Sequence, residues 1–177
     1  MEVETHRVVQ NSGLFVGIAE IAGVFVGFAA LIGITGRDEV EPSQLGQIRA
    51  VVTIGLAVIA AALIPVGLAA YGVSDRTLWF WSSLAYLLLD WGLIVLSLRR
   101  PENRQVALAQ VRTSPVGAAL FWVLLEIPIQ VPLILAVLGV SREHADAFYT
   151  TALVFHLFEA AFVLVQLVYA QAGRPRS

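Results

Sequence analysis

Hydrophobic residues fall into five long runs along this chain, and short polar segments separate the runs. The runs predict helices at about residues 12–34, 47–71, 77–98, 116–140 and 146–170. An α-helix rises 1.5 Å per residue, so about 20 apolar residues cross a hydrocarbon core about 30 Å thick. Each run reaches that length. The pattern therefore predicts an all-α, polytopic membrane bundle of five transmembrane helices, folded as a single domain over residues 1–177.

Residues that end or begin helices stand at the boundaries of these runs. Gly36 is expected to end the first helix, and Pro42 stands where the second can begin. Ser114 and Pro115 form a cap followed by a first-turn proline, which is the expected entry to the fourth helix. Ser141 can cap the last helix. These boundaries agree with five separate helices.

Three prolines lie inside the predicted helices: Pro65 in the second, and Pro128 and Pro132 in the fourth. Proline has no backbone N–H, so it leaves the carbonyl four residues earlier without its helical partner. We expect neighbouring groups to satisfy the carbonyl that Pro65 frees, as in other membrane helices. The fourth helix should be bent or locally unwound.

The composition is typical of a membrane protein, and it excludes several kinds of functional site. Hydrophobic residues make up 58% of the chain and charged residues 14%, against about 45–50% and about 25% in typical soluble domains. Cysteine is absent, which excludes disulfides, thiolate metal sites and a cysteine nucleophile. All 11 basic side chains are arginine, so a lysine Schiff base is also excluded.

The arginines predict the orientation. With five spans, one side of the membrane holds Arg37, Arg49, Arg99, Arg100, Arg104, Arg112, Arg174 and Arg176, and the other holds Arg7, Arg76 and Arg142. The positive-inside rule then places the N-terminus outside and the C-terminus in the cytoplasm. Residues 1–11 are too acidic for the start of a cleaved signal peptide, so we expect the first run to remain as a helix. The predicted location is the cytoplasmic membrane.

Ionisable side chains occur inside four of the five runs. Such a group at the centre of a membrane helix costs about 2.5–3.5 kcal/mol, so it needs a partner or a function. Counted at 1.5 Å per residue from the outer end of each span, these groups fall in two adjacent layers near the midplane. Similar depth predicts one shared site. The candidate ion- or proton-binding residues are Glu20, Asp90, Glu126, Gln130, His156 and Glu159.

Helical periodicity places these residues on narrow faces, because positions three, four and seven apart lie together. The expected stripes are Trp79, Ser83, Tyr86, Asp90 and Ser97 in the third helix, Trp122, Glu126 and Gln130 in the fourth, and Tyr149, His156, Glu159 and Gln166 in the fifth. In the first helix, Glu20 shares a face with several glycines, which predicts the most closely packed side, either toward the shared site or at the seam of a homo-oligomer. In the second, Gly55, Ala62 and Ala69 recur at heptad spacing and suit close packing.

His156 and Glu159 are the strongest candidates, because an imidazole and a carboxyl one turn apart can share and relay a proton near neutral pH. The same spacing permits metal ligation, although one buried histidine does not determine a metal. Glu126 lies near Pro128, and carbonyls freed by proline can help to form ion sites. The alternative for all these groups is structural, as interhelical hydrogen bonds worth about 0.6 kcal/mol on average.

These features predict a small membrane protein that conducts or transports protons or cations through an acid-lined interior. Because five helices enclose little space, we expect a homo-oligomer. The alternative is a membrane assembly or accessory subunit whose polar residues are contacts between helices, and a third possibility is a membrane enzyme or redox subunit. No nucleotide-binding, hydrolase or zinc-protease motif occurs, and no basic aromatic surface favours nucleic acid. We expect no cofactor; the expected partners are lipid, a second copy, and a proton or small cation.

Overall fold

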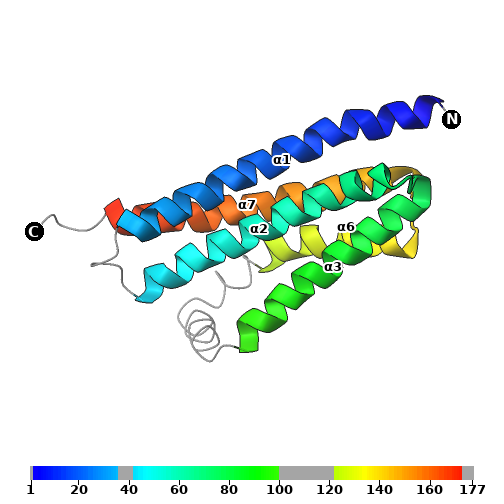
Figure 1. Cartoon of the computed structure of the whole chain (residues 1–177). Coiled ribbons are helices and arrows are strands. Elements are labelled where there is room, and N and C mark those ends of the chain that lie inside the picture. The colour runs from blue at the N-terminus through cyan, green and yellow to red at the C-terminus, as the bar shows by residue number, and fades with distance from the viewer. Residues whose placement is uncertain (1, 36–41, 100–121, 173–177) are drawn as a thin grey trace, which may run out of the picture.

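The computed structural model describes residues 2–35, 42–99 and 122–172 of the chain. Its elements are α1 (Glu2–Thr35), α2 (Pro42–Ala70), α3 (Asp75–Arg99), the π-helical turn η1 (Trp122–Glu126), α6 (Ile127–Leu138), the 3₁₀ turn η2 (Arg142–His144) and α7 (Ala145–Ala172). The described residues contain no strand. The helices run back and forth, with α1, α3 and α7 pointing one way and α2 and α6 the other (Figure 1). The all-helical prediction is confirmed.

Among the described residues, four helices are long and apolar enough to cross a membrane. They are Ser12–Thr35, Gln44–Ala70, Arg76–Arg99 and Ala145–Tyr169. A shorter apolar helix, Val123–Leu138, packs against α3 and α7. The beginning of the predicted fourth helix, residues 116–121, lies outside the described residues. This architecture is compatible with a multi-pass membrane protein.

The helix boundaries follow the predicted runs, with two extensions. α1 begins at Glu2 rather than near residue 12, because no glycine or proline interrupts the polar segment and it continues the same helix. α2 begins at Pro42, ahead of its apolar run, at the proline that suits a first helical turn. The ends of α2, α3 and α7 lie within about two residues of the prediction.

Two glycine turns close the bundle at one end (Figure 1). After α2, Gly72 has a φ of 80°; its N–H donates to the Ala69 carbonyl at 2.9 Å, and the Val73 N–H donates to the Leu68 carbonyl at 3.1 Å. Gly139 ends α6 in the same way, with a φ of 72°. A left-handed glycine with this pair of hydrogen bonds satisfies the last carbonyls of a helix. Both reversals are therefore specified locally.

The predicted cap of the last helix is wrong. Ser141 has a left-handed backbone, with a φ of 48°, and its side chain makes no capping hydrogen bond. The η2 turn separates it from α7, because the His144 N–H donates to the Ser141 carbonyl at 2.8 Å. At the start of α7, the Asp146 carboxylate instead accepts a hydrogen bond from the Ala147 N–H at 2.9 Å.

α1 and α2 approach each other closely at Gly55. A Cβ atom at this position would lie 2.5 Å from the Val26 side chain and 3.4 Å from the Ala22 carbonyl oxygen. Ala62 is fully buried, whereas Ala69 is half-buried. Close packing of α2 against α1 is confirmed at Gly55, since only a very small residue allows the two backbones this near.

The glycine face of α1 does not pack within the chain, so the prediction that it lies toward the shared site is wrong. A Cβ atom added at Gly13, Gly17, Gly23 or Gly27 would meet no atom within 4 Å. α1 instead packs through larger side chains on its opposite face, including Phe15. These bury more apolar surface than glycine can, and burial drives the choice of face.

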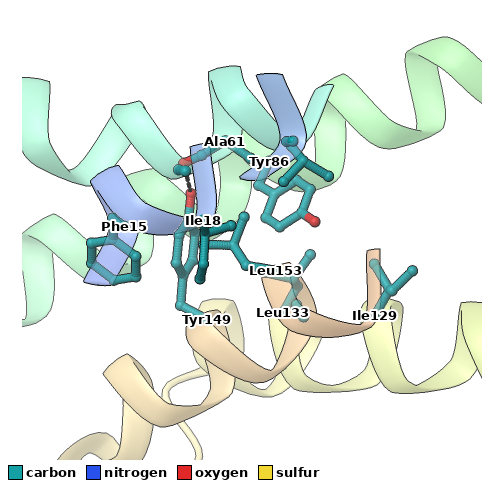
Figure 2. Close-up of a cluster of buried hydrophobic side chains, with 12 residues drawn as sticks. Phe15, Ile18, Ala61, Tyr86, Ile129, Leu133, Tyr149 and Leu153 are labelled. Carbon is teal, nitrogen blue, oxygen red and sulfur yellow. Dashed lines mark hydrogen bonds between the residues drawn. The ribbon is translucent and has the colours of Figure 1, made fainter. Parts of the chain in front are cut away.

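All five helices contribute to one core (Figure 2). Its members include Phe15 and Ile18 of α1, Ala61 of α2, Tyr86 of α3, Ile129 and Leu133 of α6, and Tyr149 and Leu153 of α7. Figure 2 shows Tyr149 reaching across this core to the backbone of α2.

The Tyr149 hydroxyl satisfies the carbonyl that Pro65 leaves free. Ala61 stands four residues before Pro65, so its carbonyl lacks the usual helical N–H donor. Tyr149 donates to this oxygen at 2.6 Å, and both groups are buried. The prediction that a neighbouring helix compensates for Pro65 is confirmed, and it ties α7 to the middle of α2.

Candidate functional site

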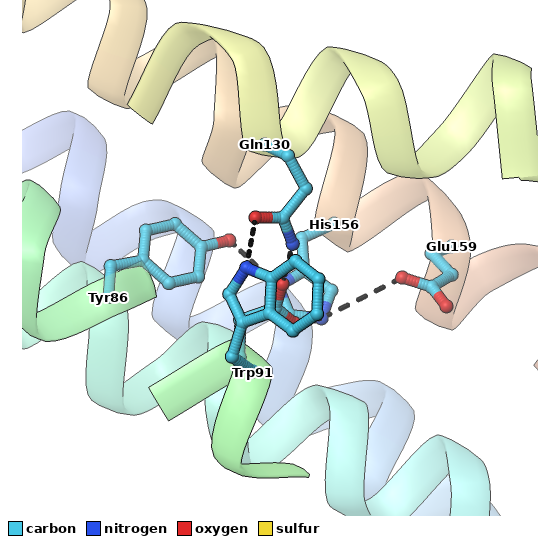
Figure 3. Close-up of polar contacts among 6 residues, drawn as sticks. Tyr86, Trp91, Gln130, His156 and Glu159 are labelled. Atoms are coloured by element: carbon cyan, nitrogen blue, oxygen red, sulfur yellow. Dashed lines mark hydrogen bonds and ion pairs between the residues drawn. The ribbon is translucent and has the colours of Figure 1, made fainter. Parts of the chain in front are cut away.

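Polar side chains from three helices meet beside Tyr86, which is also a member of this core (Figure 3). The group, here called the polar cluster, comprises Tyr86, Asp90 and Trp91 of α3, Gln130 of α6, and His156 and Glu159 of α7. Periodicity produces this meeting, because Tyr86 and Asp90 are four residues apart on α3 and His156 and Glu159 are three apart on α7.

His156 lies at the centre of the polar cluster and is only 3% exposed. Its Nδ1 atom is 2.7 Å from the Tyr86 hydroxyl oxygen. Its Nε2 atom is 3.9 Å from Asp90 Oδ1 and 3.7 Å from Glu159 Oε2. When Nδ1 accepts a hydrogen bond from the Tyr86 hydroxyl, the neutral imidazole carries its proton on Nε2, facing both acids. The ring therefore separates a hydroxyl on one side from two carboxyls on the other.

Gln130 links α6 to two neighbouring residues of α3. Its Nε2 atom donates to Asp90 Oδ2, and its Oε1 atom accepts from the Trp91 indole N–H at 3.1 Å. An indole N–H can only donate, so it fixes which end of the amide faces Asp90. Asp90 is thereby held through one oxygen, while its other oxygen faces His156.

Glu126 borders the polar cluster from the η1 turn. Its side chain is half-buried, and it interacts electrostatically with Asp90 and Glu159. Three carboxyl groups in this proximity repel one another when they are charged. A π-helical turn displaces the following residues around the helix axis, and such turns are frequent at functional sites. Pro128, two residues further on, lies in the first turn of α6, which begins at Ile127.

The grouping of Glu20 with the other acids is not what the structure contains. Glu20 is exposed on α1, on the side opposite to the residues that pack against the bundle. Depth along a helix does not fix the direction of a side chain around it, and the glycine face on which Glu20 lies points outward. Ser97 and Gln166, predicted on the stripes of α3 and α7, are also exposed.

Aromatic rings cover the polar cluster toward the end of the bundle where α3 and α7 begin. This aromatic layer consists of Phe15, Trp79, Tyr86 and Tyr149, with ring centroids 5.6–6.1 Å apart in successive pairs. Mutually edge-on or tilted rings at this distance are a favourable packing arrangement. Trp79 packs against the core.

Two contacts of the polar cluster do not follow from the sequence pattern. Periodicity favours Asp90 as the partner of Tyr86, but the tyrosine hydroxyl contacts His156. Trp91 lies beside the polar stripe and is 54% exposed, so the pattern gives no reason to include it. The available signal is the spacing of Tyr86 and Asp90, which identifies the face but not the partner across the interface.

The polar cluster has the groups needed to pass a proton. A tyrosine hydroxyl, an imidazole and a carboxyl each both donate and accept in at least one protonation state. The gaps from Nε2 to the two acids exceed hydrogen-bond length, so a transfer needs a small movement or a bridging water. Within residues 2–35, 42–99 and 122–172, no group of three or more histidine, cysteine, aspartate or glutamate side chains is arranged to hold a metal ion.

The chain matches no protein-family model, no curated protein and no solved structure.

Proposed function

We propose that this protein is a small multi-pass membrane protein that conducts or transports protons, or a small cation, through the polar cluster. One observation carries the proposal. A fully enclosed histidine has a tyrosine hydroxyl at one ring nitrogen and two carboxyl groups near the other. In the proposed relay, Tyr86 passes a proton to Nδ1 of His156, and Nε2 releases one to Glu159 or Asp90.

The energetic cost of the acids supports a functional role. Asp90, Glu126 and Glu159 would together cost roughly 8–10 kcal/mol if charged within the membrane, at about 2.5–3.5 kcal/mol each. Hydrogen bonds between membrane helices return only about 0.6 kcal/mol each. Protonation lowers the cost, and a group that gains and loses a proton in this setting is suited to a relay.

We further propose five spans, with the N-terminus outside and the C-terminus in the cytoplasm. The alternating direction of the helices supports an odd number of crossings (Figure 1). The distribution of arginines, eight on one side and three on the other, supports the orientation. Residues 123–138 supply about 24 Å of the fourth crossing at 1.5 Å per residue.

A second candidate function, membrane assembly, is favoured by the outer face of α1. Gly13, Gly17, Glu20, Val24 and Gly27 follow one another at intervals of four and three residues, the spacing of a left-handed helix pair. The glycines leave open space, and a carboxyl in the middle of a span needs a partner. A second copy of the chain would present the same groups at the same depth, so a homo-oligomer is proposed under either function.

Proton flux in proteoliposomes tests the leading proposal. Purified wild-type protein and its variants are reconstituted with a pH-sensitive dye inside the vesicles, and a pH gradient is imposed. We expect Glu159→Gln and His156→Phe each to lower flux at least about tenfold, because each removes one step of the relay. The matched control is Glu143→Gln, at an exposed position in the turn before α7. Flux that is equal in wild type, Glu159→Gln and His156→Phe would reject proton transfer through the polar cluster.

A further inference from the structure

Two adjacent hydroxyl groups on α3 are buried without any hydrogen-bond partner in the described residues. Ser82 and Ser83 are both 0% exposed, and the Oγ atom of each lacks a partner. Three threonine hydroxyls of these helices are satisfied locally: Thr35, Thr150 and Thr151 each donate to the carbonyl four residues earlier, at 2.8–2.9 Å. Ser82 and Ser83 make no such bond.

An unsatisfied buried hydroxyl is costly. Leaving one without a partner costs about 1–3 kcal/mol, and the surrounding lipid hydrocarbon offers no donor or acceptor to reduce that cost. Alanine would fill nearly the same volume at both positions without the cost. A hydrogen-bonding ligand at these two serines would remove that cost.

The two serines lie next to the polar cluster. Ser82 and Ser83 precede Tyr86 by four and three residues, so all three occupy the same side of α3. Ser83 also follows Trp79 by four residues, which places it between two rings of the aromatic layer. Tyr86 is fully buried, and its hydroxyl already contacts His156.

The aromatic layer lies between His156 and the end of the bundle where α3 and α7 begin, so a proton that enters from that end must pass through this layer. Phe15 and Trp79 have no group that can pass a proton along such a route, and the Tyr149 hydroxyl is bonded to the Ala61 carbonyl. Ser82 and Ser83 are the hydroxyls of this level of α3 that have no partner among the described residues. A polar path through the layer therefore has these two groups available.

We propose that Ser82 and Ser83 bind internal water, which delivers protons to Tyr86. This inference rests on the proposed function. Buried waters make about three hydrogen bonds each, so one or two molecules can satisfy both serines and approach Tyr86. The water takes up a proton from the aqueous side and passes one to the tyrosine oxygen, the tyrosine hydroxyl proton passes to His156 Nδ1, and Nε2 releases its proton to ionised Glu159 or Asp90. One proton therefore enters for each that leaves, and rotation of the tyrosine hydroxyl together with turnover of the imidazole ring restores the starting arrangement.

The first measurement is proton flux in proteoliposomes. We expect the double variant Ser82→Ala, Ser83→Ala to lower flux at least about fivefold. The matched control is Thr150→Ala, which removes a half-buried hydroxyl that already bonds to its own helix. Retained elution volume and helix content show whether each variant is folded. A folded double variant with wild-type flux would overturn delivery through the serines.

The second measurement detects the water directly. X-ray radiolysis converts bound water to hydroxyl radicals that label adjacent side chains, and mass spectrometry locates the label. Because Tyr86 is 0% exposed, its labelling requires internal water. We expect Tyr86 to be labelled in the wild type and in Thr150→Ala, and at least about fivefold less in the serine double variant. Equal labelling in all three proteins would overturn the water site. A labelled Tyr86 in a wild type without flux would reject the proposed function and leave the water site standing.

Discussion

At the scale of single residues, Tyr149 performs a task that the chain cannot perform locally. Pro65 removes one N–H from the middle of α2, and the hydroxyl that replaces it arrives from a helix more than eighty residues away in sequence. The same tyrosine packs in the aromatic layer above the polar cluster. The position of that layer thus depends on a defect in the backbone of another helix.

This relation predicts a specific coupling between Tyr149 and Pro65. Tyr149→Phe should destabilise the protein by about 1–3 kcal/mol, because it leaves the Ala61 carbonyl buried and without a donor. In a Pro65→Ala background the restored N–H supplies that donor. The cost of Tyr149→Phe should therefore be smaller in this background by at least about 1 kcal/mol. Reversible unfolding in detergent, followed by circular dichroism, gives the four free energies of this cycle. Equal costs in both backgrounds would contradict the coupling.

At the scale of whole helices, glycines differ in whether a neighbouring helix packs against them. Gly55 of α2 is pressed against Val26 of α1, whereas a Cβ atom added at Gly92 of α3 would meet no atom within 4 Å. Glycine therefore allows close helix packing in α2 at Gly55 but has no such role in α3 at Gly92. Sequence alone does not separate these cases, because both glycines stand in apolar helical surroundings.

Alanine substitution should separate them by the sign of its effect. Gly55→Ala should lower stability by about 1–3 kcal/mol, because the added methyl overlaps the Val26 side chain. Gly92→Ala should raise stability by up to about 1 kcal/mol, because alanine favours the helix and the added methyl has room. Thermal unfolding of both variants in the same detergent provides the comparison. A stabilising Gly55→Ala would show that α1 and α2 are not in close contact there.

Sequence patterns predict the helices well because length and hydrophobicity decide them. Pro42 and Pro65 are also interpreted correctly, since the missing N–H has fixed consequences. The direction of a side chain around its helix is harder to predict. Glu20 has a depth similar to that of His156 but lies on the outer side of α1, because the larger residues of that helix determine which face packs. Partners across an interface, such as Tyr86 and His156, depend on packing between helices that sequence periodicity does not specify.

At the scale of the whole molecule, one face of α1 packs against the bundle and the opposite face is left uncovered. α1 packs mainly against α2 and less against α7. Its other side displays glycines and Glu20. A homo-oligomer built on this face would remove the one acid of the first apolar run from lipid, and would keep the polar cluster of each copy intact.

The proposed oligomer predicts a difference between two open glycines. Gly17→Leu should reduce the oligomeric fraction at least about fivefold, because the larger side chain separates the two copies of α1. Gly67→Leu is the matched control, since a methyl at Gly67 of α2 also meets no atom within 4 Å and the position lies on another helix. Native mass spectrometry of both variants in the same detergent gives the fractions. An unchanged oligomer in Gly17→Leu, or equal loss in Gly67→Leu, would rule out assembly through this face.

The contact between Trp91 and Gln130 fixes which groups of the polar cluster donate and which accept. Because the indole N–H can only donate a hydrogen bond, it binds the amide oxygen of Gln130, and the amide nitrogen must face Asp90. Asp90 Oδ2 must therefore accept a hydrogen bond. This order of donors and acceptors is set by an indole that is itself partly exposed. Loss of that one N–H would let the amide turn over, and two opposite orders of donors and acceptors would then compete around His156.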